Sequence, residues 1–395
     1  MIGFDLDPDQ IAIQQRARDV AVEVKPQAAF WDEHEQFPES SYAALRASGL
    51  LALTVPEEFG GDGKGVFEAC LVLEELARGC MATALVAQMF FNGPPRAIAV
   101  LGTEEQKQRL LPGVASGERY FAIAMTEPGA GSSGTELMTD VRHGEEGDLL
   151  LNGTKCYITG GDRADSFLVF CRAAGSAGAK GIGAVVVRSS QPGFAVTDVQ
   201  PKMGGRGVAE ATLVFDDVRV ADKDVLLRPV LGSTAGARLL LRQFNPERCG
   251  NAAMCIGVAQ AALDDAVTYT SERQQFGRPI VEFQGLNWKL ADMAVRIEAA
   301  RLMLWRAATS SVDGFPALRE TAMAKLVANE MSQWVTNEAI QVHGHQGYIR
   351  ARPLERYFRD VRGMALGGGT SEILRNMIAE QVAGRRFHQW GGETR

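Results

Sequence analysis

The hydrophobic pattern of the chain changes its period twice, and this order limits the folds that the chain can adopt. Over residues 8–111, apolar residues recur every three or four positions, as they do on one face of a helix. Over residues 119–225, short runs rich in β-branched and aromatic residues follow one another. From Asn245 onward, long helical patterns return. The pattern therefore predicts an α region, a β region and a second α region.

The middle region has the signals of an antiparallel domain. Its strand-like runs are punctuated by Asn152-Gly153, Gly160-Gly161 and Pro192-Gly193, dipeptides that favour tight turns. No helix-length pattern intervenes, which argues against a parallel sheet with crossover helices. We expect an N-terminal α-helical domain over residues 1–119, a central antiparallel β-barrel or sandwich domain over 120–236 and a C-terminal four-helix bundle over 237–395.

Charge and composition exclude several classes of protein. The 395 residues carry a formal net charge of −7, which argues against a nucleic-acid-binding partner. The six cysteines form no CxxC pair, so neither a metal site nor a disulfide framework is expected. The first residues include acidic side chains, and no stretch approaches the roughly 20 apolar residues of a membrane span. We expect a cytoplasmic protein without a membrane partner.

The segment Met125–Ser133 combines glycine, proline and three hydroxyl side chains after a predicted strand. Such a turn exposes N–H groups and hydroxyls that suit an anionic or heteroaromatic ligand, although an ordinary hairpin connection is the simpler interpretation of this segment alone. A set of widely spaced segments is more specific. In their order along the chain these are Ala124–Ser132, Gly153–Thr159, Arg273–Gly277, Gln341–Tyr348, Arg359-Asp360 and Gly369–Ile373. Together they resemble the acyl-CoA dehydrogenase family.

The resemblance covers nearly the whole chain and implies a function. Members of this family bind FAD where the β domain meets the helical bundle, and they typically form homotetramers built as a dimer of dimers. A base removes the α-proton of an acyl thioester, and a hydride passes from the β-carbon to the flavin N5. An electron-transferring flavoprotein usually accepts the electrons.

The same resemblance assigns the residues that would bind FAD. Met125, Thr126, Gly131 and Ser132 would lie along the flavin, and Tyr157, Ile158 and Thr159 would cover its other face. A neighbouring subunit would lend Arg273, Phe276, Gln284, Gln341 and Gly344 to the pyrophosphate and adenine, and Thr370 and Glu372 would add contacts near the carboxy terminus. An arginine is a natural partner for a pyrophosphate, although Arg273 by itself would also suit an exposed helix end.

The position of the catalytic base departs from the common pattern. Most members carry a glutamate one residue before the Gly-Thr of the last segment, where this chain has Gly368. A minority, including isovaleryl-CoA dehydrogenases, place the glutamate before an arginine, 26 residues ahead of the Arg-x-x-Phe-Gly segment. Glu247, followed by Arg248, lies 26 residues before Arg273. Glu247 is therefore the predicted base.

Glu247 also has a purely structural explanation. Asn245, Pro246 and Glu247 read as the N-cap and first two residues of a helix, where the helix dipole favours an acidic side chain. The missing base at residue 368 favours the catalytic role. If both positions address the same substrate carbon, then Glu247→Thr combined with Gly368→Glu should recover some activity.

The sequence leaves the substrate open. The resemblance implies substrate contacts from Ser132, Asn245, Arg248, Gly368 and Gly369. The likeness to isovaleryl-CoA dehydrogenases favours a short or branched acyl group, and the space left at Gly368 would admit branching at the α or β carbon. The thioester could belong to CoA or to a carrier protein. Alternatives are another flavin chemistry on the same fold, such as a monooxygenase, a nitroalkane-type oxidase or a desulfinase, and a non-catalytic FAD-binding paralogue.

Overall fold

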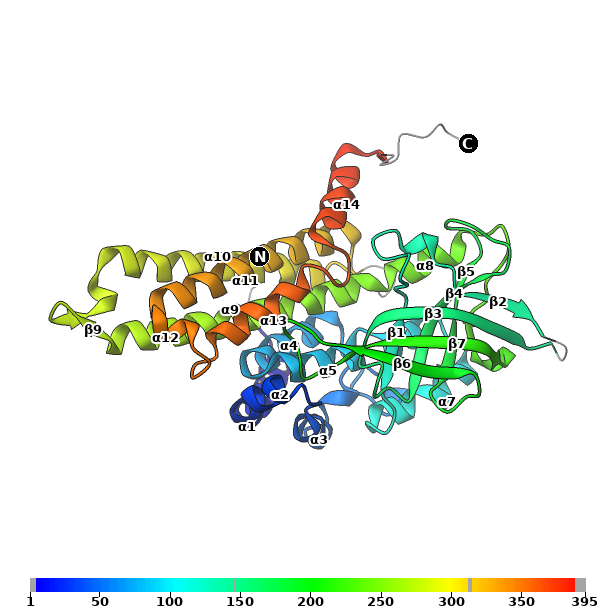
Figure 1. The fold of residues 1–395 in the computed structure, drawn as a ribbon, viewed down its shortest axis with the longest axis horizontal. Coiled ribbons are helices and arrows are strands. Elements are labelled where there is room, and N and C mark those ends of the chain that lie inside the picture. Colours follow the sequence, from blue (N-terminus) through cyan, green and yellow to red (C-terminus); the bar gives the residue numbers. More distant parts are fainter. Residues whose placement is uncertain (1–4, 145–146, 312–314, 388–395) are drawn as a thin grey trace.

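The computed structural model describes residues 5–144, 147–311 and 315–387, and it contains the three predicted regions in the predicted order (Figure 1). The helices of the N-terminal region are α1 (Pro8–Val24), α2 (Ala28–His34), α3 (Glu39–Ala47), α4 (Val66–Gly79), α5 (Met81–Phe91), α6 (Pro94–Leu101) and α7 (Glu104–Ala115). Reciprocal capping boxes begin two of them, Asp7 with Gln10 at α1 and Thr103 with Gln106 at α7. Helix α5 is buried along its whole length.

The middle region is one mixed sheet. Its strands are β1 (Phe121–Ala124), β2 (Asp140–His143), β3 (Leu149–Thr159), β4 (Ser166–Ala173), β5 (Ile182–Arg188), β6 (Phe194–Gln200), β7 (Glu210–Val220) and β8 (Val225–Leu227). They pair in the order β6-β7-β3-β2-β4-β5-β8, with β1 beside β4. Most pairs are antiparallel, as predicted, but β1 and β2 both run parallel to β4.

The two parallel strands explain how the turn after β1 is presented. Because β5 covers one edge of β4 over its full length, β1 and β2 must share the other edge. Phe121 pairs with Ser166 at the start of β4, and Asp140 pairs with Arg172 near its end. The two strands therefore lie end to end along β4. The chain between them, residues 125–139, is not part of the sheet.

One predicted turn is wrong. Asn152 and Gly153 lie inside β3, at a register shift against β7, rather than between two strands. The Asn152 side chain donates to Asp217 Oδ1 at 2.8 Å and accepts from the Asp217 N–H at 3.0 Å. A Cβ at Gly153 would lie 2.4 Å from the Thr139 hydroxyl oxygen, so glycine is needed here for close approach to β2 and not for a chain reversal.

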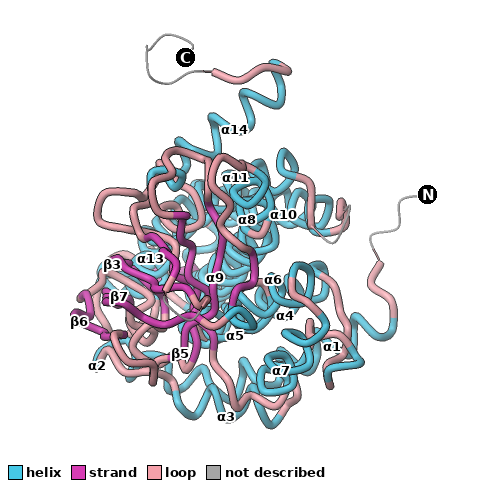
Figure 2. The backbone as a smooth tube through the Cα atoms, turned by 90° about the vertical axis from the view of Figure 1, so that its right-hand side faces the viewer, coloured by secondary structure: helices cyan, strands magenta, loops and turns pink. Residues whose placement is uncertain are grey.

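The C-terminal region is helical again. It contains α8 (Ala235–Arg242), α9 (Phe244–Glu272), α10 (Gln284–Ala308), α11 (Leu318–His343), α12 (His345–Tyr348), α13 (Leu354–Met364) and α14 (Ser371–Ala383), with a small hairpin of β9 (Gln274–Gln275) and β10 (Arg278–Pro279) after α9. Figure 2 shows α9 in the middle of the molecule, between α4 and α5 on one side and α10 and α11 on the other. Small residues permit this packing: the Cβ of an alanine at Gly257 would lie 2.1 Å from the Glu74 carbonyl oxygen of α4.

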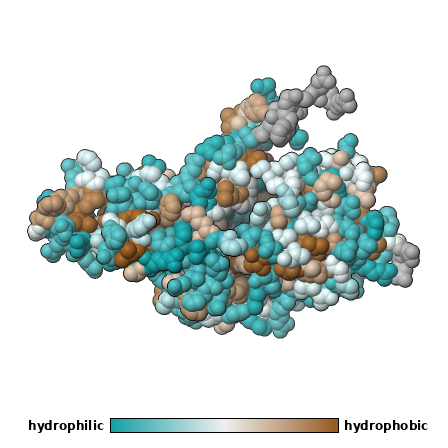
Figure 3. Space-filling model, viewed as in Figure 1, coloured by the Kyte–Doolittle hydropathy of each residue, from teal (hydrophilic) through white to brown (hydrophobic). Residues whose placement is uncertain are grey.

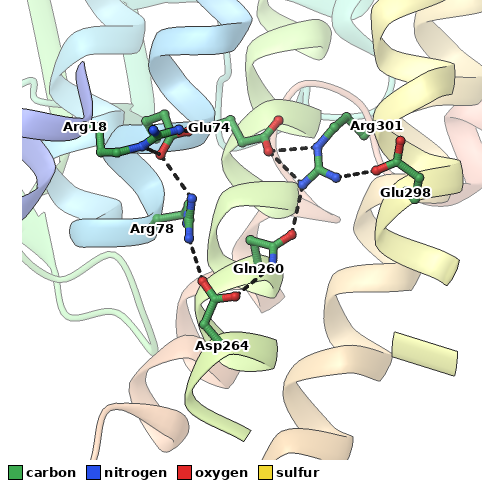
Figure 4. A network of polar contacts seen from close by, with 8 residues as sticks. Arg18, Glu74, Arg78, Gln260, Asp264, Glu298 and Arg301 are labelled. Carbon is green, nitrogen blue, oxygen red and sulfur yellow. Dashed lines mark hydrogen bonds and ion pairs between the residues drawn. The ribbon is translucent and has the colours of Figure 1, made fainter. Parts of the chain in front are cut away.

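Ion pairs join the two helical regions across α9 (Figure 4). Arg301 of α10 donates to Glu74 of α4 at 2.9 Å and also to Glu298 and Gln260. In the same network, Glu75 accepts from Arg18 and Arg78, and Arg78 reaches Asp264 of α9 at 2.6 Å. Burial raises the pKa of Glu74 while Arg301 acts in the opposite direction, so the arginine compensates a carboxylate that has lost its water.

The segment Arg359-Asp360 clamps α13 onto the rest of the chain. Arg359 donates to both carboxylate oxygens of Asp32 on α2, at 2.9 and 2.5 Å. Asp360 accepts from the N–H of Gly205, in the connection between β6 and β7, at 2.7 Å. Within the residues that the structure covers, no helix combines the length and the apolar character needed to cross a membrane.

Candidate active site

A buried lysine holds the segment that follows β1, residues 125–139. Lys155 of β3, which has no solvent exposure, donates to the Met125 carbonyl oxygen at 2.9 Å and to Glu127 Oε1 at 2.8 Å. The Glu127 carboxylate also accepts from the N–H groups of Met138 and Thr139, at 2.5 and 2.9 Å. Burial raises the pKa of Glu127, but Lys155 and these hydrogen bonds outweigh it and the net shift is downward. Lys155 and Glu127 thus fix the backbone of the turn.

The residues expected on the two faces of a flavin lie next to each other. The Thr126 carbonyl oxygen accepts from the Cys156 N–H at 2.9 Å, which brings the turn alongside Tyr157. Tyr157 adopts a left-handed backbone, with φ of 56°, and its side chain is 60% exposed, whereas Ile158 is buried. Such a conformation is strained for a non-glycine residue and is common at ligand sites. An exposed aromatic ring beside a rigid turn fits a heteroaromatic cofactor.

The outer part of the turn is open. Gly131 and Ser132 are exposed, and a Cβ placed on Gly131 would meet no atom within 4 Å. Thr159 is the last residue of β3. The outer surface of the turn, which carries hydroxyl side chains, is therefore open to a ligand.

The start of α9 packs against this sheet. The ring of Phe244 lies 5.9 Å from that of Phe170 on β4, the strand to which β1 also pairs. Only Gln243 separates α8 from α9, and its backbone is itself helical, with φ of −57° and ψ of −25°. The predicted N-cap at Asn245 is therefore wrong. Its side chain instead donates to the Pro316 carbonyl oxygen at 2.9 Å and accepts from Arg248 at 2.7 Å.

The predicted substrate contacts gather around the glycine-rich segment before α14. Arg248 donates through Nε to the Gly368 carbonyl oxygen at 3.1 Å. Lys325 of α11, fully buried, donates to the carbonyl oxygens of Gly369 and Met364 at 3.0 and 2.9 Å. Two buried cations thus hold this segment beside the Glu247 backbone. Burial lowers the pKa of Lys325 to about 8.

The carboxy-terminal residues follow directly. Thr370 caps α14 by accepting from the Ile373 N–H at 3.3 Å, and Glu372 lies in the first turn of that helix. Hydrogen bonds to its own N–H and to Thr370 lower the pKa of Glu372. Thr370 follows Gly369 directly and Glu372 is three residues after it, so both border the segment that Arg248 and Lys325 hold.

Glu247 has the electrostatics of a general base. Its Oε1 is shielded from solvent and has no hydrogen-bond partner among the described residues. Burial raises the pKa of the carboxyl group to about 8, and the neighbouring Arg248 acts in the opposite direction. A carboxylate whose pKa lies near the working pH is well matched to removing a weakly acidic proton.

We expect the rate of flavin reduction to rise with pH. Since Glu247 must be ionised to accept a proton and burial holds its pKa near 8, the rate should fall about tenfold for each pH unit below that value. Anaerobic single-turnover absorbance measurements between about pH 6 and pH 9 test this. A flat profile over that range would rule out a carboxyl base with a raised pKa.

Moving the base to residue 368 should recover only a small part of the activity. Gly368 has φ of 68°, which strains any other residue, although its Cβ would lie an acceptable 3.5 Å from Lys325 Cε. A glutamate there would stand beside a buried cation, which lowers its pKa and weakens it as a base. In Glu247→Thr with Gly368→Glu, we expect weak flavin reduction whose pH midpoint lies below that of the wild type. Full recovery, or an unchanged midpoint, would contradict this interpretation of Lys325.

The third predicted group lies elsewhere. Residues assigned to a neighbouring subunit's FAD are all exposed and lie near the end of the molecule formed by the β9-β10 hairpin and α12, away from the sheet (Figure 1): Arg273, Phe276, Gln284, Gln341 and Gly344. Phe276 is 91% exposed and has φ of 52°. The structure thus brings the turn and Tyr157 together, and Asn245, Glu247, Arg248 and the 368–369 segment together, but it separates both from the hairpin.

Three family models match the chain in succession. These are the acyl-CoA dehydrogenase N-terminal domain over residues 7–118, the middle domain over 122–218 and the C-terminal domain over 234–383. A 3-sulfinopropanoyl-CoA desulfinase of Paraburkholderia xenovorans is 42% identical over 389 residues, covering 98% of this chain and 99% of the relative. The acryloyl-CoA reductase (NADH) of Anaerotignum propionicum is 37% identical and covers 97% of each chain.

Solved structures agree with the fold. Butyryl-CoA dehydrogenase from Megasphaera elsdenii superposes with a TM-score of 0.92 at 31% identity, covering 97% of this chain and 100% of that one. The fold and the matches to this family define a flavoprotein oxidoreductase of CH–CH groups. The chain belongs to the acyl-CoA dehydrogenase family, a family of FAD-dependent enzymes.

Proposed function

We propose that the chain oxidises a short or branched acyl thioester between its α and β carbons, with Glu247 as the base. The observation that carries this assignment is the Glu247 carboxyl group, which has an unpartnered Oε1 and a pKa raised to about 8 by burial. The absence of a side chain at Gly368 leaves that carboxyl group as the one candidate at the two positions where relatives carry the base. Arg248 and Lys325 donate to the carbonyl oxygens of residues 368 and 369, so the position of this segment relative to Glu247 is fixed.

The cofactor would be held by the turn and by β3. Met125, Thr126, Gly131 and Ser132 would line one side of FAD, Tyr157, Ile158 and Thr159 the other, and Thr370 and Glu372 the end near α14. Bound FAD supplies the acceptor for the β-hydride. Glu247 takes the α-proton onto its unpartnered Oε1, which is shielded from solvent.

The substrate assignment draws on the relatives. The names of the two relatives and of the solved structure specify sulfinopropanoyl, acryloyl and butyryl thioesters, all with three or four carbons in the acyl chain. Ser132, Asn245, Arg248, Gly368 and Gly369 are the proposed contacts to the thioester. We include an electron-transferring flavoprotein as the acceptor in this proposal.

An anaerobic titration tests the proposal. Purified holoprotein is mixed in turn with propanoyl-, butanoyl-, isobutanoyl-, isovaleryl- and hexadecanoyl-CoA while the oxidised flavin band is followed. Bleaching by the short or branched esters supports the proposal, and bleaching by the long ester alone would refute the substrate class. Sulfite release from 3-sulfinopropanoyl-CoA without bleaching would establish the desulfinase alternative. Peroxide release in air would identify an oxidase, and bleaching only by carrier-protein thioesters would identify the other substrate carrier.

A second copy of the chain would complete each FAD site. The hairpin residues are exposed and lie away from the turn, so one chain does not place both sets around one cofactor (Figure 1). Trp288, Val295 and Leu302 of α10 are also exposed and recur every seven residues, which gives one apolar helix stripe. Figure 3 shows further hydrophobic surface at this end of the molecule. We propose a homotetramer arranged as a dimer of dimers.

Complementation between two inactive variants tests the shared site. Glu247→Gln removes the base and Arg273→Glu removes a contact that would come from the neighbour, so each variant alone should be inactive. In a mixed dimer one site carries both changes and the other carries neither, so co-expression should restore about a quarter of the wild-type sites. Activity that stays at background in co-expressed, tetrameric protein would place Arg273 in the same site as Glu247 and refute the sharing.

A further inference from the structure

Three buried amide side chains lie in the α8-α9 segment or pack against it, and each has an oxygen without a partner among the described residues. Gln243, Glu247 and Asn251 are spaced four residues apart, so they lie on one face of the α8-α9 segment. Asn92, at the end of α5, donates to Gln88, and Gln88 donates to the Glu247 carbonyl oxygen. These two hydrogen bonds link Asn92 to the start of α9. The oxygens Asn92 Oδ1, Gln243 Oε1 and Asn251 Oδ1 are shielded from solvent and unpaired within the described part of the chain.

Backbone carbonyl groups fix which amide atom is the oxygen. Gln88 Nε2 lies 3.1 Å from the Glu247 carbonyl oxygen, and because a carbonyl oxygen only accepts, the Gln88 atom there must be nitrogen. Gln88 Oε1 then accepts from Asn92 Nδ2 at 3.1 Å, which leaves Asn92 Oδ1 as the free atom. Asn251 Nδ2 donates to the Met364 carbonyl oxygen at 3.1 Å, which leaves its Oδ1 free in the same way.

The described residues around the start of α9 therefore include three shielded hydrogen-bond acceptors that have no donor. A buried acceptor without a donor is costly, and the cost is removed when a ligand supplies the donor. An acyl chain that ends in a methyl group supplies none, and a carboxylate adds another acceptor. One unpaired donor is Nη2 of Arg96 on α6, whose Nε donates to the Phe91 carbonyl oxygen at 3.3 Å.

A hydroxyl group satisfies both kinds of atom, because it donates one hydrogen bond and accepts others. Shielding from solvent does not remove these atoms from the reach of a substrate, since Glu247 Oε1 is shielded in the same way and must reach the α-carbon. We infer that the preferred substrate is a short acyl thioester with a hydroxyl group on its distal carbon, bound by Asn92 and Asn251. This inference rests on the proposed function, since it assigns the acyl group that Glu247 deprotonates.

Matched thioesters test this inference. Butanoyl-, 4-hydroxybutanoyl- and succinyl-CoA differ only at the fourth carbon, and pentanoyl-, 5-hydroxypentanoyl- and glutaryl-CoA form the same series one carbon longer. With wild-type holoenzyme, we expect kcat/KM for the hydroxyacyl ester to exceed that for both companions by about tenfold in at least one series. Calorimetric Kd values measured with Glu247→Gln holoenzyme, which does not turn the esters over, should show the same order.

The variants Asn92→Leu and Asn251→Leu keep the side-chain size and remove the acceptor. Each should lower the ratio of hydroxyacyl to hydrocarbon kcat/KM by about tenfold. Asn329→Leu is the matched control, since Asn329 is a buried amide on α11 whose Oδ1 is already occupied by the Cys255 thiol. It should leave the ratio unchanged. Gln243 is excluded because its Nε2 holds the carbonyl oxygens of Asn92 and Gly93 at the turn after α5.

The outcomes separate this inference from the proposed function. If the hydrocarbon or the dicarboxylic esters are oxidised as well as the hydroxyacyl esters in both series, the inference is overturned and the dehydrogenase assignment stands. The same conclusion follows if both leucine variants fold and keep the wild-type ratio. Should a leucine variant fail to fold, the wild-type comparison alone decides. If no thioester is bound or oxidised, the proposed function fails and this inference fails with it.

Discussion

Glu247→Gln should lower the rate of substrate-dependent flavin reduction by about 10³-fold, within the range that a general base contributes to catalysis. Glutamine has nearly the same size and cannot accept the α-proton, so binding of FAD and of the thioester should be preserved. The Oε1 of Glu247 makes no hydrogen bond within the described structure that the substitution would break. Stopped-flow absorbance under anaerobic conditions measures the rate, and the visible spectrum reports the amount of bound flavin.

Two controls make this result decisive. Glu330→Gln changes an exposed carboxylate on α11 and should leave the rate unchanged. Stability gives an independent check: because the pKa of Glu247 is raised in the folded state, its contribution is fully favourable below its unfolded pKa and is lost as the pH rises through about 8. The variant should therefore lose less thermal stability than the wild type between about pH 6.5 and pH 9. A near-normal reduction rate would show that Glu247 is not the base.

Arg301→Met should destabilise the protein by about 3–5 kcal/mol, because it leaves the buried carboxylate of Glu74 without its cation. Arg301 also binds Glu298 of its own helix and Gln260 of α9, so the substitution separates α4, α9 and α10 at one point (Figure 4). For a chain of this length the loss corresponds to a fall in Tm of about 5 °C. Differential scanning calorimetry of the holoprotein measures it.

An exposed ion pair provides the matched control for Arg301. Arg375 and Glu330 are each about half exposed, at 52% and 51%, so Arg375→Met should cost less than about 1 kcal/mol. Adding Glu74→Gln to Arg301→Met should recover a large part of the lost stability, since no buried charge then remains at that site. Equal effects of the Arg301 and Arg375 substitutions would show that burial does not govern the strength of this network.

The sequence predicted the order of the three regions because hydrophobic period is a local property. Strands β1 to β7 lie within residues 119–225, where the short apolar runs predict a β region. The parallel pairing of β1 and β2 with β4 was not predicted, since it depends on contacts between residues some 30 to 50 positions apart. The misplaced turn at Asn152-Gly153 has the same origin, because a glycine required by a neighbouring strand looks locally like a glycine required by a turn.

The candidate site could be predicted where a residue's expected role shows in its type and position, as for Glu247 with Gly368, and these roles stay predictions. The sequence does not show roles that arise only from packing. Lys155 and Lys325 look like ordinary surface lysines in the sequence, yet both are fully buried and hold the backbone of the two site segments. A charged residue within an apolar strand was the one available signal for Lys155. The N-cap assignment of Asn245 failed because α8 runs almost directly into α9.

The ion pair of Lys155 with Glu127 has a consequence for how the cofactor is acquired. Because this pair and its hydrogen bonds tie the Met125–Glu127 backbone to β3 and to Thr139, little chain entropy remains to be lost when the flavin arrives. Preorganisation of this kind predicts that protein from which FAD has been removed keeps its fold and takes up added FAD in a single fast phase. Formation of the holoenzyme would then be limited by the supply of the vitamin-derived cofactor, and not by a slow rearrangement of the turn.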